Sequence, residues 1–294
     1  MQPVAKWLVA RPQNAVLGLA ATLLLPFAQL ISGSIIVLLT LQQGLRVAFL
    51  ESVAALAILG VLSLIVSAPL AQLLVNAVVT WLPVMLLAAL MVRSRSLTLA
   101  FQVSAIAAIV VTMGFFVVLD DPTVFWGDVL MRLSAFFAEL GLQEQSDLLA
   151  TQKDLLAPQM TMVVVGSSWS IIVLVLALGY ALYRVLPGKS ATFGRFCDLN
   201  FGRVLALIMA VTSVTAVFAG TAWLQNIAFV AFVIFWVQGL AIVHWMHLER
   251  GVHIVVVIGL YALIFVLNAL VVIGLAAVGY TDAWFEFRNR KKRA

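Results

Sequence analysis

The chain has 294 residues, of which 64% are hydrophobic and only 10% are charged, and its formal net charge is +5. A soluble domain is about a quarter charged, so the composition excludes an ordinary soluble protein. The positive charge does not indicate nucleic-acid binding, because the basic residues lie in short stretches between apolar runs, as in membrane proteins. These runs are continuous and do not alternate with polar residues, which excludes a β-barrel. We therefore predict an all-α polytopic transmembrane helix bundle.

Nine apolar segments predict the membrane helices, since a helix needs about 20 apolar residues to cross the hydrocarbon core. The segments are 14–31, 34–45, 47–66, 70–92, 97–119, 159–184, 203–223, 225–247 and 252–279. The second is too short to span squarely. It follows Ser32-Gly33-Ser34, which predicts a helix break, and it ends at Gln42-Gln43-Gly44. We expect it to be short or half-inserted, giving eight to nine membrane segments.

The positions of Lys and Arg predict the orientation of the chain. Lys6 and Arg11 precede an uncleaved first helix and place the N-terminus in the cytoplasm. Later basic residues return to that side: Arg46, Arg93, Arg95, Arg184, Lys189, Arg195 and Arg203. The acidic segment 120–158 then faces outwards. Three further segments would place the basic C-terminus outside, so we expect either 34–45 or part of 252–279 not to cross fully.

The external segment contains one predicted amphipathic helix. Asp121-Pro122 is a helix-start signal, with Asp as the N-cap and Pro at the first helical position. Apolar side chains follow on one helical face from Trp126 to Leu140, with charged residues opposite. We expect this helix, residues 124–140, to lie flat on the outer membrane surface, either as a packing element or as a lid over a cavity. A second short helix is predicted to start at Ser146.

Neutral polar residues inside the apolar segments are candidates for ligand binding, because polar groups in hydrocarbon cost free energy unless they are paired. Gln72 and Asn76 are four residues apart and share one helix face. The predicted substrate-binding set is Gln29, Gln72, Asn76 and Gln102. The alternative is that these amides join helices, at about 1 kcal/mol each.

Arg46 and Glu51 are the predicted intramembrane charges. Glu51 lies more than one turn inside its predicted segment. One interpretation is a positive-inside anchor with a nearby counter-ion, and the other is a proton- or cation-coupled step at Glu51. A spacing of five residues does not by itself imply that the two side chains pair.

The remaining candidates for chemistry are the histidines and the cysteine. His244 and His247 have a spacing that could hold a metal ion on one helix face, with His253 nearby. Interfacial histidine is the alternative, and no H-E-x-x-H is present, so we expect no metal site. The sequence also lacks a P-loop, GxSxG and a dinucleotide glycine pattern, and Cys197 has no CxxC partner. We therefore expect no catalytic residue and no cofactor, and the alternative is an intramembrane or lipid-modifying enzyme that uses Glu51 and the histidines.

Three short stretches resemble the YybS-like family of bacterial multi-pass membrane proteins. They are LQQGLR (41–46), GLAIVHWMHLERG (239–251) and the closing GYTDAWFEFRNRKKR (279–293). The family signature corresponds here to Gly239, His244, Gly279, Asp282, Phe287 and Arg288. The resemblance implies the bacterial cytoplasmic (inner) membrane.

The first six helices of that family are in turn similar to the S components of energy-coupling factor transporters. Residues 14–185 show the corresponding plan, and residues 186–294 add further helices and a basic tail to the same integral membrane domain. The resemblance implies a small-molecule ligand and a membrane protein partner. The Ala-x-x-x-Ala docking surface of S components is not evident in the first helix. The alternative is a non-transporting scaffold or assembly factor acting through protein or lipid partners, which the lack of an evident deep charged pair favours.

The C-terminal tail is predicted to anchor the chain at a membrane surface. Gly279 is expected to close the last helix, and Tyr280, Trp284 and Phe285 to lie at the headgroups. The basic residues expected to contact anionic lipid are Arg288, Arg290, Lys291, Lys292 and Arg293.

Overall fold

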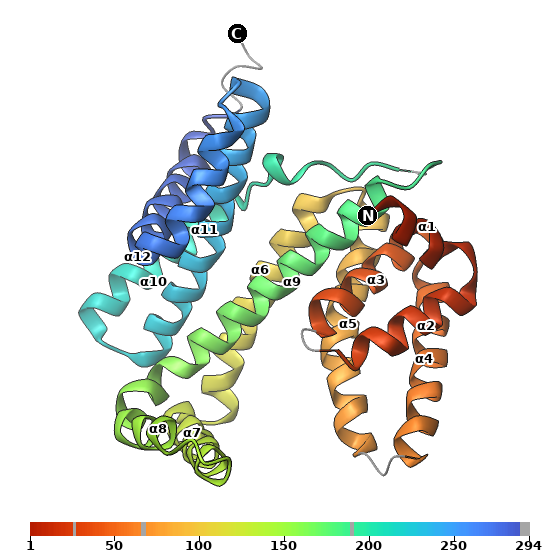
Figure 1. Ribbon diagram of the computed structural model, residues 1–294. Coiled ribbons are helices and arrows are strands. Elements are labelled where there is room, and N and C mark those ends of the chain that lie inside the picture. Colours follow the sequence, from red (N-terminus) through yellow and green to blue (C-terminus); the bar gives the residue numbers. More distant parts are fainter. Residues whose placement is uncertain (26–27, 66–68, 189–190, 289–294) are drawn as a thin grey trace. The chain divides into compact units, whose positions relative to one another are not determined.

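The computed structural model of the protein describes residues 1–25, 28–65, 69–188 and 191–288, and all the regular secondary structure in these residues is helical (Figure 1). The N-terminal helices are α1 (Gln2–Ala10), α2 (Pro12–Leu23), α3 (Ala28–Gln43), α4 (Leu45–Ile65), α5 (Leu70–Ser94) and α6 (Leu97–Val118). The later helices are α7 (Pro122–Glu139), α8 (Gln143–Leu156), η1 (Ala157–Gln159), α9 (Met160–Arg184), η2 (Phe196–Asp198), α10 (Gly202–Ala219), α11 (Ala222–Arg250) and α12 (Ile254–Phe285).

The apolar helices confirm that the protein is a multi-pass membrane protein. Among the described residues, six helical stretches are long and apolar enough to cross a bilayer, namely α4, α5, α6, the continuous run Gln143–Arg184, α10 and α11. Shorter apolar stretches lie in α3 and α12. Large apolar side chains remain exposed on these helices, for example Val117 at 80% and Phe218 at 86%. Such faces suit a hydrocarbon solvent and would be unfavourable in water.

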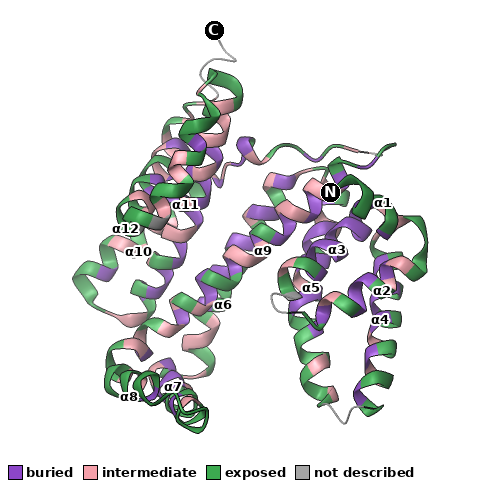
Figure 2. Ribbon diagram, viewed as in Figure 1, coloured by how far each residue is buried: buried purple, intermediate pink, exposed green. Residues whose placement is uncertain are grey.

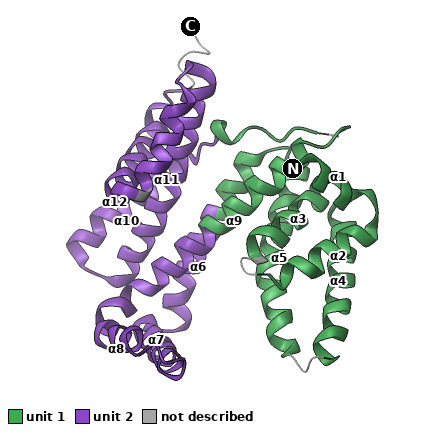
Figure 3. Ribbon diagram, in the orientation of Figure 1, with its two compact units in different colours: residues 1–104, 170–198 green, residues 105–169, 199–294 purple. Residues whose placement is uncertain are grey.

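The chain forms two compact units (Figure 3). Unit 1 comprises residues 1–104 and 170–198, and unit 2 comprises residues 105–169 and 199–294. The division passes through the interiors of α6 and α9.

The centre of unit 1 is α3, which packs against α2, α4 and α5 and is buried from Ser32 to Leu41 (Figure 2). The predicted break at Ser32-Gly33-Ser34 is wrong, because α3 runs through all three residues. The Ser34 hydroxyl donates to the Leu30 carbonyl at 2.5 Å, so it does not compete with the helix. A Cβ on Gly33 would lie 2.9 Å from the Val175 side chain. This glycine therefore permits close packing of α9. The predicted end of α3 before Gly44 is confirmed, since Gly44 has a φ of +91°.

The helices α7 and α8 form a small apolar cluster in unit 2. The predicted N-cap is confirmed, because the Asp121 carboxylate accepts from the Thr123 amide at 2.8 Å. Trp126 packs in the cluster and donates its indole N–H to the Thr161 hydroxyl at 2.8 Å. The second helix begins at Gln143, three residues before the predicted start. Ser146 is instead a buried residue of α8 whose hydroxyl lies 3.0 Å from that of Ser134.

The helices α11 and α12 touch at two glycines. The prediction that Gly279 closes the last helix is wrong, because α12 continues to Phe285. A Cβ on Gly279 would lie 2.1 Å from the Phe235 carbonyl oxygen, and a Cβ on Gly239 would lie 2.0 Å from that of Leu275. Both glycines therefore let the two backbones approach closely, which is a common use of small residues in membrane helices.

Candidate functional site

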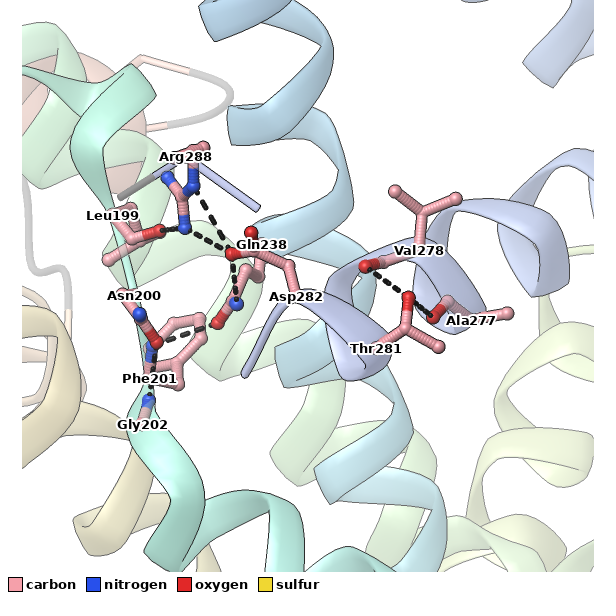
Figure 4. A network of polar contacts seen from close by, with 10 residues as sticks. All are labelled: Leu199, Asn200, Phe201, Gly202, Gln238, Ala277, Val278, Thr281, Asp282 and Arg288. Carbon is pink, nitrogen blue, oxygen red and sulfur yellow. Dashed lines mark hydrogen bonds and ion pairs between the residues drawn. The ribbon is translucent and has the colours of Figure 1, made fainter. Parts of the chain in front are cut away.

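Unit 2 contains a buried ion pair between Asp282 and Arg288, which takes part in a network of hydrogen bonds (Figure 4). Arg288 Nη2 lies 2.6 Å and Nε lies 3.2 Å from Asp282 Oδ2. The Arg288 side chain is 9% exposed and that of Asp282 is 1% exposed. Water is thus largely excluded from the pair, so the attraction between the charges is screened far less than at a surface.

Two other segments of unit 2 join this pair. Gln238, in the middle of α11, donates to Asp282 Oδ2 at 3.1 Å and accepts from the Phe201 amide at 2.8 Å. Arg288 Nη2 also donates to the Leu199 carbonyl at 2.6 Å. We call these five residues the C-terminal clamp: Leu199, Phe201, Gln238, Asp282 and Arg288. The clamp connects the start of α10, the middle of α11 and the end of α12.

Local backbone geometry places Arg288 in the clamp. The α12 helix ends at Phe285, and its C-cap is Glu286, whose φ of +48° lies in the left-handed region and whose amide donates to the Asp282 carbonyl. This turn reverses the chain, so that the Arg288 side chain reaches a carboxylate six residues earlier. At the other side of the clamp, the Asn200 side chain accepts from the Gly202 amide at 2.8 Å and fixes the start of α10.

One prediction about charge is corrected by the clamp. Arg288 was expected to contact lipid, but it is buried against Asp282 because the turn at Glu286 directs it inwards. The other predicted lipid-contacting residues lie outside the described part of the chain: Arg290, Lys291, Lys292 and Arg293.

The carboxylate of Glu51 forms a separate polar site in unit 1. Glu51 is 5% exposed and lies on the face of α4 that also buries Ala48, Ser52 and Ala55. With the Gln43 amide oriented so that both of its groups are satisfied, its nitrogen lies 3.2 Å from each oxygen of Glu51. Arg46 is exposed, and no ion pair joins it to Glu51 among the described residues. Arg46 is therefore not a directly paired counter-ion of Glu51 in the structure.

The four amides predicted to bind a substrate lie in different surroundings. Gln29, Gln72 and Asn76 are exposed on α3 and α5. The Asn76 side chain accepts from the Thr80 hydroxyl at 3.5 Å, one turn along the same helix. Gln102 is half-buried on α6. No hydrogen bond among the described residues joins any two of these four amides.

The histidines contact separate backbone groups. His244 Nδ1 lies 2.8 Å from the Leu240 carbonyl oxygen, and the ring meets Tyr261 edge to face. His247 Nδ1 lies 2.6 Å from the Val252 carbonyl oxygen. His253 is the N-cap of α12 and accepts from the Val255 amide at 3.3 Å. The contacts of His247 and His253 stabilise the turn between α11 and α12.

Four of the six residues on which the expected family resemblance rests lie in one region of unit 2. Gly239 and Gly279 form the close contact between α11 and α12, and Asp282 and Arg288 form the ion pair beside it. His244 lies farther along α11, and Phe287 stacks on Phe285. Gln238, next to Gly239, is a member of the clamp that the predicted substrate-binding set does not include. Its position as an amide inside an apolar segment was the available signal. Comparisons with protein-family models, curated proteins and solved structures find no match for this chain.

Proposed function

We propose that the protein is a membrane binding or transport protein for a small cation, and that Glu51 is the carboxylate that binds this cation. The observation that carries the proposal is a buried acid in an apolar membrane helix without a basic partner among the described residues. Ionisable residues within membrane segments most often mark ion or substrate pathways. In this function no residue has a catalytic role.

The position of Glu51 supports this function. The α4 helix has 21 residues, and Glu51 is the seventh of them, so it lies roughly 9 Å along the helix axis from the first residue. Its side chain points towards the interior of unit 1, where α2, α3 and α5 pack against α4. A carboxylate buried there without a compensating charge costs several kcal/mol. A bound cation would supply that compensation.

A buried oxygen atom near the end of α3 adds to the support. The Gln42 side-chain oxygen is buried and has no hydrogen-bond partner in the described part of the chain. Carboxylate and amide oxygens are the ligands that hard cations prefer. Gln43, the next residue, presents its amide nitrogen to Glu51 and donates to the carboxylate, so it orients Glu51 and is not itself an oxygen ligand.

The test is cation-dependent thermal stability of the purified full-length protein in nanodiscs. The probes are Na⁺, K⁺, NH₄⁺, Mg²⁺ and Ca²⁺, each titrated at constant ionic strength with choline chloride. A ligand that binds only the folded state stabilises it by about 2.7 kcal/mol at a hundredfold excess over Kd. We expect one of these cations to raise the melting temperature of the wild type.

The matched variants are Glu51→Gln and Glu139→Gln. Glu51→Gln keeps the side-chain volume and removes the charge, so we expect it to lose the cation-dependent shift. Glu139 is exposed near the end of α7, and its variant should retain the shift. Glu51→Asp keeps the charge and serves as a second variant if Glu51→Gln does not fold. An equal response of Glu51→Gln and wild type to every cation, or no response of the wild type, contradicts the proposal.

A second candidate function is a membrane scaffold that binds another membrane protein through α5. The observation that favours it is that Gln72 and Asn76 are exposed on an apolar helix. Amides at such positions commonly form hydrogen bonds between helices. Replacing both by Leu should abolish co-purification of a partner from native membranes, whereas replacing the exposed Val75 and Val79 by Leu should leave it unchanged. We also propose that the chain is related to the YybS-like family, because that family comprises multi-pass membrane proteins.

A further inference from the structure

We propose that the cation bound at Glu51 is monovalent, in the class of Na⁺ and K⁺, and that the site discriminates against Mg²⁺ and Ca²⁺. This inference rests on the proposed function and deepens it, because it names the charge of the ligand. It follows from the number of negative charges that unit 1 contains and from the neutral groups around the Glu51 carboxylate.

Unit 1 contains a single acid that is free to balance a cation. Its two stretches of chain, residues 1–104 and 170–198, hold only two acidic residues, Glu51 and Asp198. The Asp198 carboxylate is already neutralised, since its oxygens lie 2.8 Å and 3.0 Å from Nε and Nη2 of Arg195. Glu51 forms no ion pair among the described residues. Unit 1 therefore supplies one negative charge for a ligand.

The helices packed against α4 add no further charge near Glu51. The helices α2 and α3 contain no charged residue. The third neighbour, α5, has Arg93 in its last turn, and this side chain is exposed. Arg46 on α4 and Arg11, the N-cap of α2, are exposed as well. One monovalent cation neutralises this site, whereas a divalent cation leaves one positive charge in an apolar interior, which is strongly unfavourable.

The oxygen atoms close to Glu51 along α3 and α4 are neutral. The buried Gln42 oxygen has no partner in the described part of the chain. Thr40 lies on the same face of α3 as Gln43, and Ser52 follows Glu51 on α4. Both hydroxyls are buried and donate to carbonyls of their own helices, at 2.8 Å and 2.7 Å, so their oxygens keep lone pairs that can accept. Affinity for Ca²⁺ depends on the number of charged ligands, and neutral oxygens do not supply that charge.

The Gln43 amide holds the carboxylate in one orientation without adding charge. Its nitrogen lies 3.2 Å from each Glu51 oxygen. A carboxylate has about four lone-pair positions, so positions remain for a cation after this donation. Gln43 is also the position at which a second acid can be placed beside Glu51, because glutamate has nearly the same shape as glutamine. The charge of the site can thus be doubled by one substitution.

The first part of the test compares cations on the wild type. The purified full-length protein in phosphatidylcholine nanodiscs is titrated with NaCl, KCl, MgCl₂ or CaCl₂ at constant ionic strength with choline chloride, and its melting temperature is measured. We expect Na⁺ or K⁺ to give a saturating increase. Mg²⁺ and Ca²⁺ should bind at least about a hundredfold more weakly. A preference for a divalent cation overturns this inference and leaves the proposed function intact, whereas no response to any cation contradicts the proposed function itself.

The second part changes the charge of the site. Gln43→Glu provides two adjacent carboxylates, so we expect it to shift the preference towards Mg²⁺ or Ca²⁺ by at least about tenfold relative to the wild type. Gln145→Glu adds the same charge at an exposed position of α8 and should keep the wild-type preference. Gln42→Glu serves as a second variant if Gln43→Glu does not fold. A folded variant at either position whose preference equals that of the wild type contradicts the argument from charge.

Discussion

Replacing Arg288 by Gln removes one partner of the buried ion pair and leaves the Asp282 carboxylate in the interior of unit 2. The Arg288 side chain is 9% exposed and the Asp282 side chain is 1% exposed. Removing one partner of such a pair typically costs 3–5 kcal/mol, because the remaining charge is buried without compensation. The shorter glutamine side chain cannot replace both the contact with Asp282 and the hydrogen bond to Leu199. We therefore expect a loss of about 4 kcal/mol in the free energy of unfolding.

A double-mutant cycle separates the ion pair from the other effects of substitution. Asp282→Asn keeps the shape of the side chain and removes its charge, and the variant with both changes leaves no buried charge in the clamp. We expect the double variant to be less destabilised than the sum of the two single variants by about 1–3 kcal/mol, as for residues in direct contact.

The assay is reversible unfolding in mixed micelles with increasing sodium dodecyl sulfate, followed by circular dichroism and tryptophan fluorescence. Arg203→Gln is the matched control, since its pair with Glu286 is 65% and 40% exposed and such pairs contribute at most about 1 kcal/mol. If Arg288→Gln were no more destabilising than Arg203→Gln, or if the cycle showed additivity, the buried pair would not stabilise the fold as argued.

Two further predictions concern local packing and capping. Gly279→Ala should destabilise the protein by more than about 2 kcal/mol, because its Cβ would lie 2.1 Å from the Phe235 carbonyl oxygen. Gly274→Ala in the same helix has open space around it and should be neutral or stabilising by up to about 1 kcal/mol; equal effects of the two in the micelle assay would contradict the close contact. Asp121→Ala should lose the N-cap of α7 and cost about 1 kcal/mol. Asp128→Ala on the exposed side of α7 is its control, and identical unfolding midpoints would show that the cap contributes nothing.

The helices were largely predictable because apolar runs and basic flanks determine them. The segment expected at 70–92 is α5, Leu70–Ser94, and the N-cap at Asp121 was identified from a two-residue signal. Glycine was the main source of error. Gly33 and Gly279 both suggested the end of a helix, but each lies inside a helix where another element approaches closely. The sequence shows where a glycine lies. It does not show whether that glycine permits a turn or the close approach of a neighbouring helix.

The clamp was only partly predictable, for a different physical reason. Asp282 and Arg288 were noted as parts of one motif, but their pairing depends on the left-handed turn at Glu286. A residue other than glycine adopts that conformation uncommonly, so the sequence does not indicate it. The Leu199 carbonyl is a backbone acceptor that any residue could supply. In contrast, Gln238 was detectable as an amide within an apolar helix, although its partners were not.

Unit 1 is built from two separate parts of the chain, residues 1–104 and 170–198, and this has a consequence for its synthesis and membrane insertion. A Cβ on Gly179, in α9, would lie 2.4 Å from that of Val37, in α3, so the two helices touch across roughly 140 residues of intervening chain. At about 5–20 residues per second of translation, α3 enters the membrane about 7–30 s before α9 exists. During that interval the surface of α3 around Val37 and Ser34 must contact lipid, the insertion machinery or a chaperone. Nascent chains arrested before and after residue 179 should therefore differ in the cross-links that a photoreactive group at Val37 forms.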